Sequence, residues 1–273
     1  MNRLFNLCRL LNALSIDVAT GAVVGSLYLA YVLHVKPAVE DLICLGLTVW
    51  LIYTADHLLD AKKIKRPAAT YRHRVHQLYY NVLLGAASAV VVILFLLLFM
   101  LKQSTLIGGA GLALLVILYF AAQQRLGLLK ELVAAVLYAG GVALPVLTLS
   151  GSALSLVQIF VMIAWATTAL VNLVLFSWFD YEHDGQDNHP SLARRLGVAG
   201  TKNILYFLFL FQFGLAGYSM AFFSDSMPFM GTLLMMNGAL LMIFIKWRWF
   251  AGEDKYRLAG DAVFLFPVFY LLF

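Results

Sequence analysis

The chain has 273 residues, of which 63% are hydrophobic and only 12% are charged. A soluble domain carries about a quarter of charged residues, and no soluble fold of this length buries so much apolar surface. The formal net charge of +5 does not indicate a nucleic-acid partner, because the basic residues lie in short segments between apolar runs, as in membrane proteins.

Apolar runs of roughly 20 residues, the length that crosses a bilayer core of about 30 Å, recur along the whole chain. No Ser/Pro-rich linker, charged tail or low-complexity block separates them. We therefore expect a single polytopic domain over residues 1–273, an all-α integral membrane bundle of about nine transmembrane helices. The predicted spans are residues 13–34, 39–59, 79–101, 104–122, 129–150, 154–176, 203–223, 228–247 and 258–273.

Lysine and arginine are unevenly distributed over the connecting segments. Only Lys36 and Lys102 follow odd-numbered spans, whereas the others lie before the first span or near the end of an even-numbered one. Cytoplasmic loops hold most of the Lys and Arg residues of a membrane protein. This pattern predicts a cytoplasmic N-terminus and cytoplasmic loops after even-numbered spans, with the first span retained as an anchor and not cleaved as a signal peptide.

The second predicted span ends in the acidic segment Tyr53-Thr-Ala-Asp56-His-Leu-Leu-Asp60. Aspartates four residues apart lie on one face of a helix, about one turn from each other. Carboxylates at the end of a membrane helix are costly unless something uses them. A basic segment with Arg66, Arg72 and Arg74 follows directly, and we call Asp56 to Arg74 the first acidic segment.

A second acidic segment, Trp178-Phe-Asp180-Tyr-Glu-His-Asp184-Gly-Gln-Asp187, follows the sixth predicted span at the same membrane face, and Arg194 and Arg195 come after it. Carboxylate oxygens are hard ligands, and Mg²⁺ takes one or two of them together with waters and phosphate oxygens. Arginines donate to phosphate oxygens. The two segments together predict a diphosphate site bridged by Mg²⁺; the alternative is that the aspartates are solvated or paired with nearby Lys and Arg.

The second segment resembles a motif of the UbiA superfamily of intramembrane prenyltransferases, whose members have nine helices and two aspartate-rich motifs. In that family Asp-x-x-x-Asp is followed, about a dozen residues on, by a short run ending in Leu/Phe-Gly. Here Asp180 and Asp184 precede Ser191-Leu-Ala-Arg-Arg-Leu-Gly197. The first family motif is Asn-Asp-x-x-Asp-x-x-x-Asp followed by a basic stretch often containing Arg-Pro. Its counterparts here are Asp56, Asp60, Arg66 and Pro67.

The resemblance has two departures. The leading Asn-Asp of the first family motif falls on Ile52 and Tyr53, which cannot replace a carboxylate ligand, and Asn188, His189 and Pro190 occupy a region where the family often has a Lys. A divergent branch is therefore expected, with three or four carboxylates left for the diphosphate.

The resemblance implies an enzyme, a transferase of alkyl groups other than methyl, that moves a prenyl group from an isoprenoid diphosphate to a lipophilic acceptor in the bilayer. Its cofactor would be Mg²⁺, held through the diphosphate, and we expect a bacterial cytoplasmic membrane with both motif loops cytoplasmic. The implied catalytic and Mg²⁺-binding residues are Asp56, Asp60, Asp180 and Asp184. The implied diphosphate donors are Arg66, Arg72, Arg74, Lys130, Arg194 and Arg195.

Several polar residues leave alternatives open. Tyr53, Asn172 and Asp187 are candidates for the cavity, although Asn172 equally fits a hydrogen bond to a neighbouring helix. Asp17 and Asp261 are carboxylates in apolar runs and therefore functional candidates, although both equally fit a position near the membrane interface. The competing functions are a catalytically inactive UbiA-like protein that binds an isoprenoid or quinone, and a solute transporter. Five of the six histidines lie in the acidic segments or within two residues of them, but their spacing does not favour zinc.

Overall fold

The structure is a computed structural model that describes residues 3–150, 153–187 and 189–271. These residues form helices and connecting segments, and no strand is present among them. The α-helices are α1 (Arg3–Ala13), α2 (Ile16–Val32), α3 (Val39–Lys63), α4 (Tyr71–Leu78), α5 (Tyr80–Leu97), α6 (Gln103–Ala122), α7 (Lys130–Leu147), α8 (Leu156–Phe179), α9 (Tyr181–Asp187), α10 (Leu192–Phe222), α11 (Met227–Ile245), α12 (Trp247–Phe250), α13 (Lys255–Ala262) and α14 (Pro267–Leu271). The short 3-10 helices are η1 (Leu98–Met100), η2 (Gly127–Leu129), η3 (Ser224–Ser226), η4 (Gly252–Asp254) and η5 (Val263–Leu265).

Seven helices in the described part of the chain are long and apolar enough to cross a membrane, and the bent pair α1–α2 makes up to eight. This confirms the all-α integral membrane class. The expected count of nine is not reached by this measure, because the predicted span 258–273 is divided among α13, η5 and α14. A break at this place has a local cause: Pro267 lacks the backbone N–H that a continuous helix would use.

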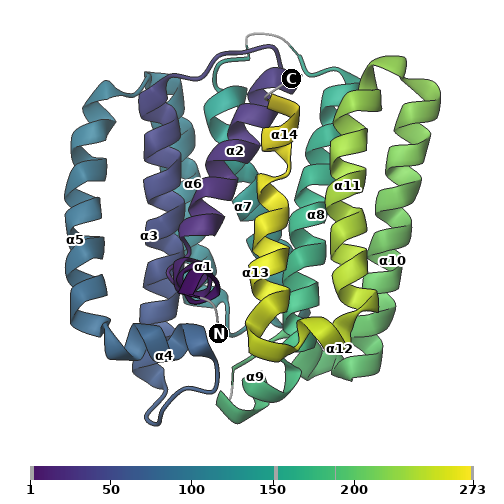
Figure 1. Cartoon of the computed structure of the whole chain (residues 1–273). Coiled ribbons are helices and arrows are strands. Elements are labelled where there is room, and N and C mark those ends of the chain that lie inside the picture. The colour runs from purple at the N-terminus through teal and green to yellow at the C-terminus, as the bar shows by residue number, and fades with distance from the viewer. Residues whose placement is uncertain (1–2, 151–152, 188, 272–273) are drawn as a thin grey trace.

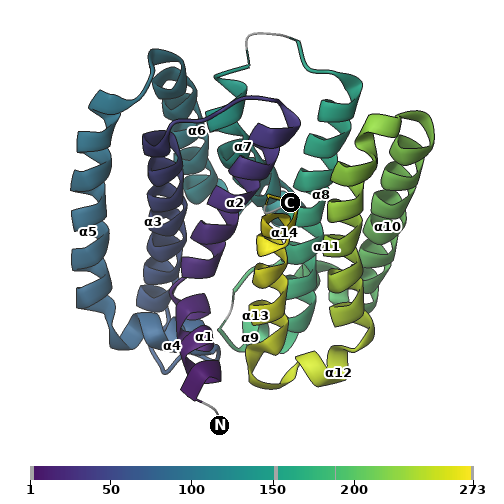
Figure 2. The same cartoon turned by 45° about the horizontal axis from the view of Figure 1, so that its top comes forward.

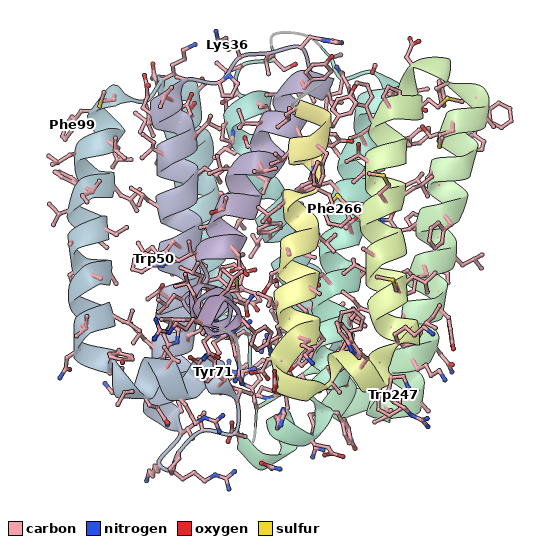
Figure 3. All side chains as sticks on the ribbon, viewed as in Figure 1. Lys36, Trp50, Tyr71, Phe99, Trp247 and Phe266 are labelled. Carbon is pink, nitrogen blue, oxygen red and sulfur yellow. The ribbon has the colours of Figure 1, made fainter. Side chains whose placement is uncertain are left out.

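Both acidic segments lie at the same end of the bundle, which we call the motif end. Figure 1 shows the long helices side by side, with the short helices α4, α9 and α12 across this end. The turned view in Figure 2 keeps the same arrangement. Figure 3 places Lys36 at the opposite end, and Tyr71 and Trp247 toward the motif end. The predicted grouping of the basic segments at one end is therefore confirmed, whereas the cytoplasmic orientation of that end remains a prediction.

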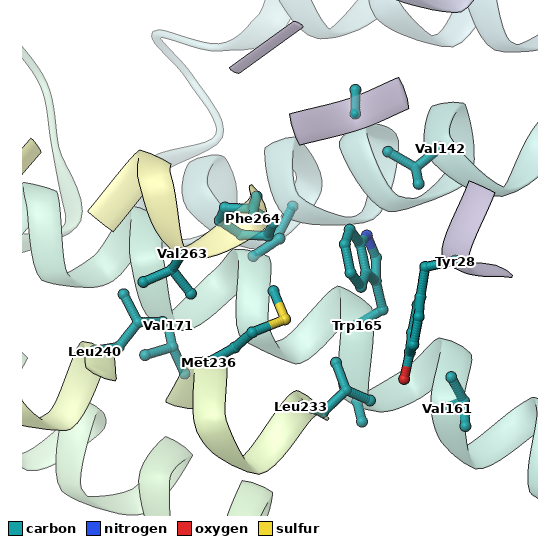
Figure 4. Close-up of a cluster of buried hydrophobic side chains, with 14 of the residues drawn as sticks. Tyr28, Val142, Val161, Trp165, Val171, Leu233, Met236, Leu240, Val263 and Phe264 are labelled. Atoms are coloured by element: carbon teal, nitrogen blue, oxygen red, sulfur yellow. The ribbon is translucent and has the colours of Figure 1, made fainter. Parts of the chain in front are cut away.

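In the interior, the Trp165 side chain of α8 packs against residues of α2 and η5. Trp165 of α8 is 1% exposed, and its ring centroid lies 5.9 Å from that of Tyr28 and 5.6 Å from that of Phe264 (Figure 4). At Gly25 the approach is so close that a Cβ atom would lie 2.3 Å from the Trp165 ring. This core fixes α8, whose last turn leads into the second acidic segment.

Helices α5 and α6, and the short helix η1 between them, present apolar side chains to the outside. Phe99 is 78% exposed, Val82 68% and Ile107 67%. In water such surfaces would drive association, whereas lipid chains cover them without cost. The outer surface of these helices thus agrees with a bundle that is embedded in a bilayer.

The start of α10 contains a turn that requires glycine. Gly197 has φ 73° and ψ 171°, a conformation that a residue with a Cβ adopts only with strain. The turn separates the first residues of α10 from its long apolar part. The short part before the turn begins at Leu192 and lies at the motif end beside the second acidic segment, and the long apolar part after Gly197 contains the predicted span 203–223.

Candidate functional site

A cavity of about 260 Å³ opens at the motif end. Its walls come from the end of α3, from α4, from the connection between α6 and α7, and from the segment around the end of α9. Residues from both acidic segments therefore share one cavity. The lining residues are Asp60, Lys63, Ile64, His73, Gln123, Gln124, Lys130, Asp187, His189 and Pro190.

Asp60 and Lys130 are linked through a histidine of the other acidic segment. Lys63 donates to the Asp60 carboxylate at 3.0 Å, and the Nδ1 atom of His189 lies 3.7 Å from the same carboxylate. Lys130 Nζ lies 2.9 Å from His189 Nε2. Because a lysine ammonium only donates, Nε2 accepts and the ring proton is on Nδ1, facing Asp60.

The two histidines of the cavity are neutral near pH 7. Burial, together with the charge of Lys130, lowers the pKa of His189 to about 4. Burial likewise lowers the pKa of His73 to about 3. The lining charges are therefore those of two carboxylates, Asp60 and Asp187, and two ammonium groups, Lys63 and Lys130.

Asp187 joins the two acidic segments directly. Its Oδ2 accepts a hydrogen bond from the Ala69 backbone N–H at 3.1 Å, and its Oδ1 lies 3.5 Å from the Arg66 guanidinium. Arg66 also donates to the Gln186 carbonyl. Arg74 donates to the Ala69 carbonyl at 3.2 Å. Arg66 and Arg74 thus hold the loop before α4 in place and are absent from the cavity lining.

Asp56 lies one turn before Asp60 on α3 and is half-buried. Its nearest charged neighbours include Asp60 and Lys130, and Gln123 bonds to its carboxylate. Its Oδ1 atom is buried and has no hydrogen-bond partner among the described residues. A buried carboxylate oxygen without a donor is a suitable ligand for a hard cation.

Asp180 is 3% exposed and is bound by two residues of α13 that no sequence motif connects with it. The Tyr256 hydroxyl donates to one carboxylate oxygen and Arg257 to the other. Burial alone would raise the pKa of Asp180, but Arg257, with bonds from His183 and Tyr256, outweighs it and holds the pKa below its ordinary value. Asp180 is therefore ionised and paired.

Asp184 has a different environment although it lies one turn away. Burial and the charge of Asp180 raise the pKa of Asp184 to about 7, against a bond from the Ser191 hydroxyl. Near neutral pH this carboxyl group is therefore divided between its neutral and ionised forms.

The first turn of α10 has no free backbone donors for a phosphate. Glu131 accepts from the Leu192 N–H at 2.7 Å, Ser177 from the Ala193 N–H at 3.0 Å and Ser191 from the Arg194 N–H at 3.4 Å. These bonds fix the second acidic segment against α7 and α8.

The other expected site residues lie outside the cavity lining. Arg72 donates to His57 Nε2 at 3.0 Å. The exposed Arg194 stacks over the Tyr181 ring at 4.9 Å. The remaining three are Arg195, which lies against Gly127, Tyr53, which lies beside His57, and Asn172, which lies 3.4 Å from Asp261. Asn188 lies outside the described residues.

Within the described chain, no three His, Cys, Asp or Glu side chains are grouped closely enough to hold a metal ion by themselves. A Mg²⁺ ion shared with phosphate oxygens needs only one or two protein carboxylates. The unpartnered Oδ1 of Asp56 and the carboxylate of Asp60 meet that requirement.

Comparisons with known proteins show the fold. No protein-family profile matches the chain, and no curated protein matches it in sequence. The apo structure of a UbiA homolog from Aeropyrum pernix K1 superposes with a TM-score of 0.66 at 14% identity, over 95% of this chain and 98% of that one. A digeranylgeranylglyceryl phosphate synthase in membranes superposes with a TM-score of 0.54 at 11% identity, over 96% and 97%. The predicted UbiA-like fold is therefore confirmed.

Proposed function

We propose that this protein is a UbiA-type prenyltransferase, which moves a prenyl group from an isoprenoid diphosphate to a lipophilic acceptor within the membrane. The observation that carries the proposal is the cavity at the motif end, where Asp60 and Lys63 of one acidic segment meet Asp187 of the other, with Lys130 beside them. The UbiA-like fold and the apolar outer surface support it.

The charges of the cavity explain why the proposed reaction uses Mg²⁺. The two carboxylates and two ammonium groups of the lining balance each other, and its histidines are neutral. A diphosphate carries several negative charges that this lining does not offset. Mg²⁺ would supply positive charge at the leaving group, held through the diphosphate by Asp56 and Asp60 and by Asp184 of the other segment, whereas Asp180 is bound by Tyr256 and Arg257.

The chain's own groups would orient the diphosphate. Lys63 and Lys130 can each donate to phosphate oxygens, since both ammonium groups face the cavity. His189 positions Lys130 through its ring nitrogen. Donors that are fixed before the substrate binds stabilise the charge that develops on a leaving group.

Release of diphosphate tests the proposal. Purified protein in lipid vesicles is given prenyl diphosphates of several chain lengths, with Mg²⁺ or with EDTA. Asp60→Asn should lower Mg²⁺-dependent release by about 100-fold or more, by loss of charge stabilisation. The matched control is Asp41→Asn on the same helix. Asp41 is also buried, at 3% exposed, but it lies at the opposite end of α3, where its carboxylate accepts a hydrogen bond from the Ala38 N–H. Folded wild-type protein that releases no diphosphate from any donor would refute the proposal.

A second candidate function is binding of an isoprenoid or quinone without turnover. One argument for it is that both carboxylate oxygens of Asp180 already accept hydrogen bonds, one from Tyr256 and one from Arg257. Another is that Ile52 and Tyr53 stand where the family motif has Asn-Asp. This function predicts that prenyl diphosphates raise the melting temperature while no diphosphate is released. The same vesicles and donors therefore separate the two functions.

A further inference from the structure

A smaller pocket lies toward the motif end, between α1, α4 and α13. Its volume is about 10 Å³, and it shares no lining residue with the larger cavity described above. Three arginines and one carboxylate are the charged groups of its lining. We call it the arginine pocket, and its wall includes Arg9 of α1, Tyr71 and Arg72 of α4, Asp254 of η4 and Arg257 of α13.

The three guanidinium groups have more donors than they use. Arg9 donates to Asp254 at 2.7 Å, and Arg257 donates to Asp180. The Nε atoms of Arg9, Arg72 and Arg257 are buried and have no acceptor among the described residues. A buried donor without an acceptor costs free energy. A ligand with several oxygen atoms would satisfy donors of more than one arginine.

The charge of Arg72 has no counter-ion in contact with it. Its hydrogen bond goes to His57 Nε2 at 3.0 Å, and because a guanidinium only donates, this nitrogen accepts and the ring is neutral. No ion pair joins Arg72 to a carboxylate of the described chain. Burial, and after it the charge of Arg257, lowers the pKa of Arg72, against the smaller effects of three carboxylates. A buried charge is stabilised by pairing, so this position favours an anion.

The arginine pocket is held in place and can be reached from outside. The Arg9 guanidinium lies over the Tyr71 ring, 4.1 Å from its centroid, which fixes its orientation. The side chains of Arg9, Asp254 and Arg257 are 20%, 21% and 16% exposed. A volume of about 10 Å³ holds about one oxygen atom. The rest of a larger anion would therefore lie at the mouth, against the exposed guanidinium groups.

Helix α1 brings the arginine pocket close to the lipid headgroups. Leu4, Leu7 and Leu11 are 70%, 52% and 39% exposed, and their spacing places them on one face of α1, opposite Arg9. The helix is bent by 72° from α2 and lies toward the motif end (Figure 2). An amphipathic helix with an apolar outer face and a basic inner face is suited to the headgroup layer.

We propose that the arginine pocket binds a phosphate group, without Mg²⁺ and independently of the proposed reaction. One phosphate oxygen enters the pocket, and the others face the guanidinium groups at its mouth. Arginine matches the geometry of phosphate oxygens, whereas a single-atom anion would leave part of the donors unused. The phosphate belongs to an anionic lipid or is free phosphate, and the position of α1 favours the lipid.

A pair of lipids that differ only by a phosphate tests the site. Dioctanoyl phosphatidic acid and dioctanoylglycerol are titrated by calorimetry into purified protein in dodecyl maltoside with EDTA. The wild type should bind phosphatidic acid about tenfold more tightly than dioctanoylglycerol. Arg9→Gln and Arg72→Gln should each weaken phosphatidic acid binding about tenfold, the size of one charge-assisted hydrogen bond. The matched control is Arg248→Gln, because Arg248 is an exposed arginine of α12 outside the pocket lining, and it should keep the wild-type affinity.

The ion pair between Arg9 and Asp254 gives a second readout. Asp254→Asn removes the one carboxylate among the lining residues, so it should tighten phosphatidic acid binding about threefold, by removing repulsion of the anion. Arg9→Gln should act in the opposite direction. If the ion pair only held the fold together, both changes would weaken binding alike, and that result would overturn the inference.

Inorganic phosphate at matched ionic strength separates the two sources. An affinity close to that of phosphatidic acid would identify free phosphate as the ligand, and binding of phosphatidic acid alone would identify a lipid. Lys63→Gln changes the larger cavity and should leave the affinity for both probes unchanged. The inference is wrong if the wild type binds neither probe, if Arg248→Gln weakens binding as much as Arg9→Gln, or if Lys63→Gln abolishes it. None of these results depends on whether the protein releases diphosphate from a prenyl donor.

Discussion

Removing the guanidinium that holds Asp180 should destabilise the fold strongly. Asp180 is 3% exposed, and the side chain of Arg257 is 16% exposed, so neither charge is compensated well by water. Breaking a buried pair by removing one partner costs about 3–5 kcal/mol, because the other charge stays behind. We therefore expect Arg257→Gln to lower the free energy of unfolding by about that amount.

The interaction itself is smaller than the cost of either single change. At an ordinary ion-pair separation of about 3 Å and an effective dielectric constant of about 20, the Coulomb attraction is about 5 kcal/mol. The Tyr256 hydroxyl also donates a hydrogen bond to Asp180, and it continues to stabilise this carboxylate when Arg257 is replaced. A double-mutant cycle with Asp180→Asn and Arg257→Gln should therefore give a coupling energy of about 2–3 kcal/mol.

Unfolding in mixed dodecyl maltoside and dodecyl sulfate micelles measures this cycle. The matched control is the pair Arg9–Asp254, whose charged atoms lie 2.7 Å apart and whose side chains are 20% and 21% exposed. More solvated pairs contribute less, so its coupling should stay below about 1 kcal/mol. Equal coupling energies for the two pairs would refute the reasoning that burial makes Asp180 and Arg257 strongly dependent on each other.

Three further changes test the packing, the loop contact and the titration. Gly25→Ala should lower the free energy of unfolding by about 1–3 kcal/mol through overpacking, and Gly85→Ala, where a Cβ meets open space, should not; thermal melting compares them. Asp187→Ala should speed tryptic cleavage of the loop before α4 about tenfold, through lost local stability, with the exposed Glu182 changed to Ala as control. Burial holds the pKa of His189 at about 4 in the folded protein, so between about pH 6.5 and 4 the unfolded chain binds more protons than the folded one. The free energy of unfolding should therefore fall as the pH is lowered through this range. Melting temperatures measured at several pH values should depend less steeply on pH in His189→Gln than in the wild type.

Apolar length was enough to predict most of the fold. The predicted spans 79–101 and 104–122 agree closely with α5–η1 and α6, because lipid-facing helices consist of apolar residues almost throughout. The helical residues on either side of the turn at Gly197, from Leu192 to Lys202, were not predicted, because Arg194, Arg195 and Lys202 lower the local hydropathy. Hydropathy indicates which residues lie in the apolar layer, but it does not predict where a helix begins or ends, because helix ends depend on capping.

The candidate site was predictable only in part. The spacing of the aspartates and the distribution of basic residues correctly placed both acidic segments at one end of the bundle. The pairing of Asp180 with Arg257, and the bridge from Asn12 to Asp261, join residues from opposite parts of the chain. Nothing in the local sequence marks either pair, because both depend on how α13 packs against α8 and α1.

The pairing of Asp180 divides the second acidic segment into two roles. Arg257 and Tyr256 hold Asp180, so this carboxylate fastens the start of α13 to the end of α8. Burial and the charge of Asp180 raise the pKa of Asp184 to about 7, although Arg257 acts on it electrostatically in the opposite direction, so its charge changes near neutral pH.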